Sequence, residues 1–235
     1  MILKNKEFDL LIDEMSFCQK CVSLKSSRGV DCSLINIFKD KSFSKNIPSI
    51  WTDWYNRLDS SILVVGQDWG PYNDMKKLQD EYIKDETIEN WKNLIESEKS
   101  LTKKQFTKFL IESSNGKLDS IDEVYFTNAI MCARCGENYR GNNINLKYST
   151  INCSNYLKRQ IEIVKPKVIL SLGYFPLLSL SLIFGFSIEE NLKRSIDELS
   201  VIEIGDYVII PLYHPVAQVK REIQMEQYRK IWNYL

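Results

Sequence analysis

Six cysteines and a single histidine stand out among the 235 residues as side chains whose types and spacing could do chemistry. Four of the cysteines form two Cys-x-x-Cys pairs, Cys18 with Cys21 and Cys132 with Cys135. Two such pairs are typical of a zinc site, and four thiolates also suit an iron–sulfur cluster. Inert buried thiols are a third interpretation, which the loop-like surroundings of both pairs disfavour. The other two cysteines are Cys32 and Cys153.

Three polar side chains, Asp68, Asn128 and His214, each follow or end a short apolar run of the sequence. Taken singly, each has a simpler interpretation: a turn aspartate accepts backbone hydrogen bonds, a strand amide bonds to a nearby loop, and a histidine caps a turn. Gly66 suits a tight turn in which backbone amides approach a ligand. Ligands bind beyond the carboxyl ends of parallel strands, so we expect the three side chains to meet around one pocket.

The elements that must position these residues follow from hydrophobic periodicity. Runs that are apolar throughout predict four strands buried on both faces, at 61–66, 124–130, 167–173 and 207–212. Helical spacing predicts helices at 8–15, 74–98, 101–113, 150–164, 175–184 and 221–235, with Thr102 as the N-cap of the third. Alternation of strands and helices indicates an α/β fold, a three-layer α/β/α sandwich with a central, mostly parallel four-stranded sheet.

Composition excludes several classes of protein. Lys plus Arg and Asp plus Glu each number 31, so the chain lacks the strong positive charge that by itself would indicate nucleic-acid binding. Apolar residues make up 44%, which excludes a largely disordered chain. No apolar run reaches about 18 residues and the first residues are charged, so we expect no membrane span and no secretory signal. We expect a cytoplasmic monomer, in whose reducing surroundings cysteines favour metal or thiol chemistry over disulfides.

Several motifs, in order over about residues 15–235, resemble those of the uracil-DNA glycosylase superfamily. Residues 64–68, Val-Val-Gly-Gln-Asp, resemble its first motif, a strand leading to a Gly-Gln-Asp-Pro-Tyr or Gly-Glu-Ala-Pro-Gly loop. Residues 126–132 resemble the segment of the iron–sulfur, family 4-like branch in which a strand runs through Thr-Asn to a cluster cysteine. Further similarities are Cys153 to Ile161 with that branch's Cys-x-x-Tyr-Leu helix, 166–173 with its next strand, and His214-Pro215-Val216 with the superfamily's His-Pro-Ser.

The resemblance implies one domain over 1–235, with residues 1–60 as an N-terminal extension that carries two cluster cysteines. It implies a DNA glycosylase that hydrolyses the N-glycosidic bond of uracil or another deaminated base, flipped out of DNA. Asp68 and His214 would be catalytic, and Gly66, Gln67, Tyr72 and Asn128 would bind the substrate. Cys18, Cys21, Cys132 and Cys153 would ligate a [4Fe–4S] cluster, with zinc as the alternative. Independently of the resemblance, the candidates for phosphate contacts are Arg134 and Arg140, or Gln218, Lys220 and Arg221 after the His-Pro turn. Ordinary solvated surface is the simpler interpretation of each one taken singly, and the position of Arg134 and Arg140 after a cluster cysteine favours that pair.

The chain also departs from the family's pattern. Trp69-Gly70 follows Asp68 where the family has Pro-Tyr, so Tyr72 and Trp69 are both candidates for the aromatic that stacks on the base. Val216 stands where the family has serine. These departures indicate a divergent member. The alternatives are a non-catalytic nucleic-acid or nucleotide-binding member of the same fold, and a zinc-bound α/β protein with an unrelated ligand.

Overall fold

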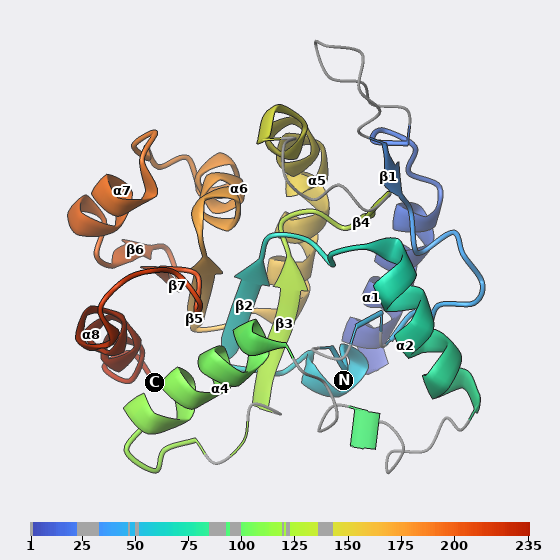
Figure 1. The fold of residues 1–235 in the computed structure, drawn as a ribbon. Coiled ribbons are helices and arrows are strands. Elements are labelled where there is room, and N and C mark those ends of the chain that lie inside the picture. Colours follow the sequence, from blue (N-terminus) through green and yellow to red (C-terminus); the bar gives the residue numbers. More distant parts are fainter. Residues whose placement is uncertain are drawn as a thin grey trace.

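The computed structural model describes residues 2–22, 33–46, 48–49, 52–84, 93–94, 100–118, 120, 123–135 and 143–235. Its centre is one five-stranded sheet with strand order β3-β2-β5-β7-β6 (Figure 1). Four of these strands are parallel and match the predicted runs: β2 (Ile62–Gly66), β3 (Val124–Asn128), β5 (Val168–Leu172) and β7 (Tyr207–Leu212). Their carboxyl ends therefore meet at one edge of the sheet.

The prediction of four strands was wrong by one. β6 (Ile202–Ile204) pairs antiparallel with β7 at the edge of the sheet. It has only three residues, all at least partly exposed, so it forms no buried apolar run that the periodicity could detect. The sequence cue for this strand was Gly205-Asp206, which forms the hairpin turn between β6 and β7. Gly205 has a φ of 57° in this turn.

Helices cover both faces of the sheet and make three layers, as expected (Figure 1). One face packs against α1 (Ile2–Ser16), α5 (Asn143–Val164) and α6 (Tyr174–Phe184). The other packs against α4 (Leu101–Ser113) and α8 (Arg221–Ile231). Successive strand residues alternate between these layers: Leu63 and Val65 join the first core, and Ile62 and Val64 the second. The strands are thus apolar throughout because both faces are buried.

Some helix boundaries differ from the predictions. Ser100 rather than Thr102 caps α4, because its Oγ accepts a hydrogen bond from the backbone N–H of Lys103 at 3.3 Å. α5 begins seven residues before the predicted start at 150. The predicted helix 74–98 is described as α2 (Tyr72–Lys84), and residues 85–92 and 95–98 lie outside the described residues. A short helix that was not predicted, α7 (Leu192–Glu198), begins at the N-cap Asn191.

The N-terminal segment packs against the same sheet. The ring of Phe8 in α1 lies edge-on to Trp54 and Tyr125, with centroid distances of 5.3 and 6.5 Å. Trp54 is fully buried and donates from Nε1 to the carbonyl of Phe126 in β3 at 2.8 Å. The 3-10 turn Tyr55–Arg57 follows Trp54 directly. None of the helices that the structure describes is long and apolar enough to cross a membrane.

Candidate functional site

A pocket of about 580 Å³ opens at the carboxyl edge of the sheet, where the topology predicted one. It brings together Asp68 after β2, Asn128 at the end of β3 and His214 after β7. Gly66 and Gln67 also line it. The remaining lining residues are Ser49, Trp69, Gly70, Ser100, Thr102, Phe126, Arg134 and Leu172.

Asn128 contributes an amide that has no hydrogen-bond partner among the described residues, although only 3% of the residue is exposed. Gly66 is its partner in the parallel register of β2 and β3. A Cβ on Gly66 would lie 2.4 Å from Oδ1 of Asn128, so only glycine leaves room for this amide. A buried amide normally makes hydrogen bonds, and one without a partner in a pocket is suited to bind a polar ligand.

The carboxylate of Asp68, in contrast, accepts four hydrogen bonds. Arg134 donates from Nε to Oδ1 at 3.0 Å and from Nη2 to Oδ2 at 2.5 Å. The backbone N–H of Gly70 donates to Oδ1 and the side-chain amide of Gln67 to Oδ2, both at 2.8 Å. The side chain of Asp68 is only 4% exposed. The predicted catalytic carboxylate is therefore in the pocket wall, held by neighbours on both oxygens.

His214 stands at the rim of the pocket, in the turn after β7, and keeps access to solvent. Its backbone carbonyl accepts from the N–H of Ala217 at 2.8 Å, which closes the turn. Loss of hydration from partial burial of the ring lowers the pKa of His214 below the ordinary value for histidine. This shift favours the neutral imidazole, which offers one N–H donor and one acceptor nitrogen.

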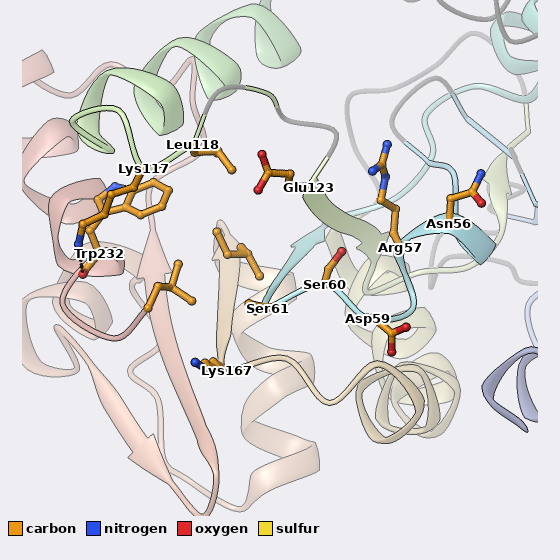
Figure 2. Close-up of a pocket in the computed structure, with 12 residues that line it drawn as sticks. Asn56, Arg57, Asp59, Ser60, Ser61, Lys117, Leu118, Glu123, Lys167 and Trp232 are labelled. Atoms are coloured by element: carbon orange, nitrogen blue, oxygen red, sulfur yellow. Dashed lines mark hydrogen bonds between the residues drawn. The ribbon is translucent and has the colours of Figure 1, made fainter. Parts of the chain in front are cut away.

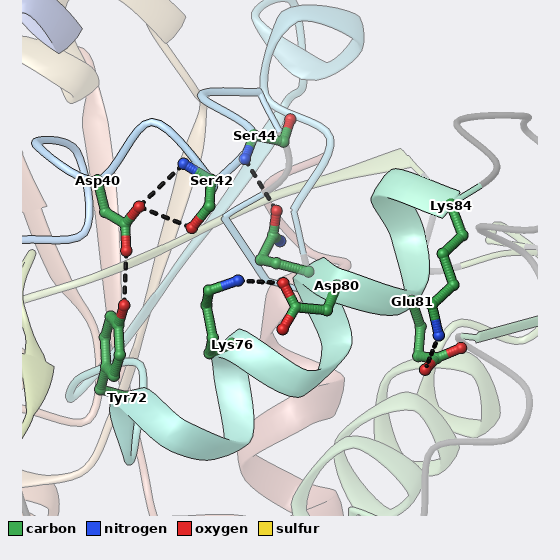
Figure 3. Close-up of polar contacts among 9 residues, drawn as sticks. Asp40, Ser42, Ser44, Tyr72, Lys76, Asp80, Glu81 and Lys84 are labelled. Atoms are coloured by element: carbon green, nitrogen blue, oxygen red, sulfur yellow. Dashed lines mark hydrogen bonds and ion pairs between the residues drawn. The ribbon is translucent and has the colours of Figure 1, made fainter.

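The structure does not bring Tyr72 to this pocket. Tyr72 begins α2, and its hydroxyl donates to Oδ2 of Asp40 at 2.6 Å (Figure 3). This hydrogen bond to a carboxylate is the main cause that raises the pKa of Tyr72 to about 12. The aromatic side chains that do line the pocket are Trp69 and Phe126. Trp69 is held by a 3.0 Å hydrogen bond from Nε1 to the carbonyl of Met131.

Sequence reasoning missed Phe126 as a lining residue. A signal was available, because Phe126 is two residues before Asn128 on the same strand and side chains two apart share a face of a sheet. It also missed the ion pair of Arg134 with Asp68, since the two residues are 66 positions apart. No motif indicated that Ser100 and Thr102, at the start of α4, would form part of the wall.

The four predicted cluster cysteines lie on segments that pack into the same apolar core. Cys18 and Cys21 follow α1, Cys132 follows β3, and Cys153 is in α5; all four belong to or pack against one apolar core. Burial, together with the charges of neighbouring thiols, raises the pKa of Cys132 and raises that of Cys153 to about 12. In the described ranges, no three His, Cys, Asp or Glu side chains are grouped closely enough for a metal ion. Cys135 is an exposed free cysteine, and Cys32 lies outside the described residues.

A second pocket, of about 470 Å³, lies at the amino ends of β2 and β3 (Figure 2). Its wall mixes the cations Lys117 and Lys167 with the anions Asp59 and Glu123, and none of the predicted site residues lines it. Asp59 is already paired with Lys4 at 2.7 Å. Asp68, Asn128 and His214 line the first pocket and not this one.

A comparison with models of known protein families found a match for this chain. Residues 52–235 match the family model of the uracil DNA glycosylase superfamily. The matched part contains the five-stranded sheet together with Asp68, Asn128 and His214. A search of curated proteins found no match. The extent of the family match, over a fold that presents these residues at one edge of its sheet, shows that the chain belongs to the uracil-DNA glycosylase superfamily.

Proposed function

We propose that this protein is a DNA glycosylase that hydrolyses the N-glycosidic bond of uracil or another deaminated base in DNA. The observation that carries the proposal is the amide of Asn128, which is buried, has no hydrogen-bond partner among the described residues and shares a pocket with Asp68 and His214. Three strands supply these side chains, and all three belong to the part of the chain that matches the superfamily. Members of the superfamily act on DNA.

In this proposal the pocket receives a base that has left the double helix, because a stacked and paired base is out of reach. The amide of Asn128 offers acceptor and donor atoms together, which matches the edge of a pyrimidine. Phe126 and Trp69 provide the aromatic faces on which a flipped base stacks. Arg140, the other predicted phosphate contact, lies outside the described residues.

Bond breaking leaves negative charge on the departing base and positive charge on the sugar. The neutral ring of His214 donates its N–H to the base oxygen as the negative charge develops, and one donor so placed is worth about 3 kcal/mol. The backbone amide of Gln67, in the loop after β2, is the second candidate donor. The carboxylate of Asp68 provides negative charge on the side of the cationic sugar. Water then adds to the sugar and completes the hydrolysis.

The alternative is a member that binds nucleic acid or a nucleotide without cleaving it. The observation that favours it is the Asp68 carboxylate itself, whose four hydrogen bonds leave no acceptor position to orient a water molecule. Both functions share the same pocket and the same contact to Asn128. They differ only in whether the bond between base and sugar breaks.

The deciding experiment measures free base released from oligonucleotides that contain uracil, hypoxanthine or xanthine, in single and double strands, under single-turnover conditions. Glycosylase activity predicts release that His214→Ala slows about 100-fold, with DNA affinity nearly unchanged. Asn128→Asp, which replaces amide donors with carboxylate oxygens, is expected to change the preferred base. Tight binding of the same oligonucleotides without release from any of them would support the binding member instead.

We further propose that Cys18, Cys21, Cys132 and Cys153 hold a [4Fe–4S] cluster, with zinc as the alternative. Two thiols after α1, one after β3 and one in α5 make up the four thiolates that such a cluster requires. A single zinc ion would draw four sulfurs to about 2.3 Å from one point, whereas a cluster binds each sulfur through a separate iron. What supports a shared site is that the thiols of Cys153, Cys21 and Cys18 contribute, after burial, to raising the pKa of Cys132. The bound cluster would cross-link the N-terminal segment to the segment after β3, with no part in the hydrolysis.

A further inference from the structure

We propose that Arg134 is a positioning residue for the reaction: its guanidinium fixes the carboxylate of Asp68, and with it the loop 66–70, in the geometry that the pocket requires. The inference rests on the proposed glycosylase function and assigns a role to an ion pair within it. The sequence suggested a different role for Arg134, as a contact to DNA phosphate.

The carboxylate of Asp68 is saturated with hydrogen bonds. A carboxylate has about four acceptor positions, and all four hydrogen bonds to Asp68 come from the protein. Two of the donors, Gln67 and Gly70, belong to the same loop as Asp68, and only Arg134 comes from another part of the chain. Arg134 therefore determines where this carboxylate stands relative to β3 and Asn128.

Arg134 is itself anchored by its backbone. It belongs to β4 (Ala133–Arg134), which pairs antiparallel with β1 (Leu34–Ile35). Its N–H donates to the carbonyl of Gly70 at 2.8 Å, so backbone and side chain both bind the loop after β2. A side chain whose backbone is fixed on both sides can place its partner with little freedom.

The contact to Asp68 uses the two-pronged shape of the arginine side chain. Nε and Nη2 of Arg134 each meet a different oxygen of Asp68, which is the fork-to-fork geometry that arginine makes and lysine does not. The side chain of Arg134 is 22% exposed, so most of it is withdrawn from the surface that DNA would cover. This geometry fits a role in placing Asp68 better than a role in neutralising a phosphate.

Positioning and simple neutralisation predict opposite effects on the rate. If Arg134 only reduced the negative charge of Asp68, its removal would strengthen that charge beside the cationic sugar and speed base release. If Arg134 places the carboxylate, its removal misplaces the charge and slows base release. A displacement of about 1 Å in an active site can cost about 100-fold in rate.

The experiment compares Arg134→Gln and Arg134→Lys in single-turnover base release, each in the wild-type and the Asp68→Asn background. We expect both substitutions to slow release about 10-fold or more in the wild type and to have little further effect in the Asp68→Asn background. Lysine keeps the charge and guards against misfolding of the glutamine variant. Faster release by Arg134→Gln, full rescue by lysine, or equal losses in both backgrounds would each overturn the proposal.

The dependence of DNA affinity on salt separates positioning from phosphate contact. A residue that neutralises one phosphate contributes about 0.9 to the slope of log affinity against log salt concentration. We expect Arg134→Gln to leave this slope at the wild-type value. A slope smaller by about one contact would assign Arg134 to phosphate and overturn the proposal. Arg159→Gln is the matched control, because Arg159 also pairs with a carboxylate, that of Glu14, away from the pocket.

Hydrogen exchange tests the role of the ion pair with a readout that does not depend on catalytic activity. The amide of Gly70 donates to Asp68 at 2.8 Å, so we expect Arg134→Gln to speed its exchange relative to the amide of Tyr228 in α8. Arg159→Gln should leave the ratio of the exchange rates of the Gly70 and Tyr228 amides unchanged. An unchanged ratio in Arg134→Gln would overturn the proposed role. If the wild-type protein releases no base but Arg134→Gln still speeds exchange of the Gly70 amide, only the glycosylase function is rejected. Arg134 then remains the residue that places the loop.

Discussion

The amide oxygen of Asn128 occupies the space that a side chain on Gly66 would need. The two residues are register partners on neighbouring parallel strands, and a Cβ on Gly66 would come within 2.4 Å of Oδ1 of Asn128. The same Cβ would lie 3.3 Å from the ring of Phe126. Gly66 thus shapes the floor of the pocket by the side chain that it lacks.

We therefore expect Gly66→Ala to displace the amide of Asn128 and to lower both stability and base release. Overpacking of this kind costs about 1–3 kcal/mol in the free energy of unfolding, measured by denaturant titration. The double variant with Asn128→Ala removes the clashing oxygen and should recover part of that stability. Equal costs of Gly66→Ala with and without Asn128 would contradict the steric explanation.

The single histidine makes a direct pH measurement possible, because only one imidazole resonance is present. Partial burial lowers the pKa of His214, so we expect a midpoint in the folded protein below that of the denatured chain, which is about 6.5. As the pH falls through this value the unfolded state takes up its proton first, and the free energy of unfolding decreases. An equal or higher midpoint in the folded protein would show that burial does not determine the pKa of His214.

His214→Gln tests the role of the ring as a donor. Glutamine keeps an N–H donor without a group that titrates near neutral pH. We expect it to retain more base release than His214→Ala and to abolish the imidazole resonance. If glutamine and alanine slow the reaction equally, hydrogen-bond donation at this position is not what the reaction uses.

Tyr72 provides a test of a residue that the structure places outside the pocket. Its hydroxyl donates to Asp40, so Tyr72→Phe should lower the free energy of unfolding by about 1 kcal/mol. Base release should stay near the wild-type rate. Asp40→Asn is the matched variant on the other side of the same hydrogen bond. A large loss of base release in Tyr72→Phe, with stability intact, would restore Tyr72 to the substrate site.

Cys153→Ser should remove the cluster, whereas Cys135→Ser and Cys32→Ser should not. Cys153 is buried among the other candidate ligands, and Cys135 is exposed. Iron and sulfide analysis of protein purified without oxygen measures the difference. Because metal binding is coupled to folding, Cys153→Ser should also make the segment around Cys18 and Cys21 more sensitive to protease. Purified wild-type protein that contains zinc and no iron would count against the cluster.

The apolar pattern of the sequence was sufficient to predict the central strands and the edge of the sheet at which the site lies. β2, β3, β5 and β7 are apolar throughout because helices cover both faces, and this pattern is visible in any one segment. Parallel strands end at the same edge, so Asp68, Asn128 and His214 had to come near one another. The order of motifs around them was sufficient to indicate the superfamily.

Tertiary structure alone decided what surrounds each of these side chains. The ion pair of Asp68 with Arg134 joins residues that are 66 positions apart. The hydroxyl of Tyr72 bonds to Asp40, which is 32 positions away. β6 became part of the sheet only through pairing with β7. Local patterns report burial and backbone preference, whereas the partner of a polar side chain depends on the directions in which distant elements point after packing. For that reason the edge of the sheet was predictable and the ion pair of Asp68 with Arg134 was not.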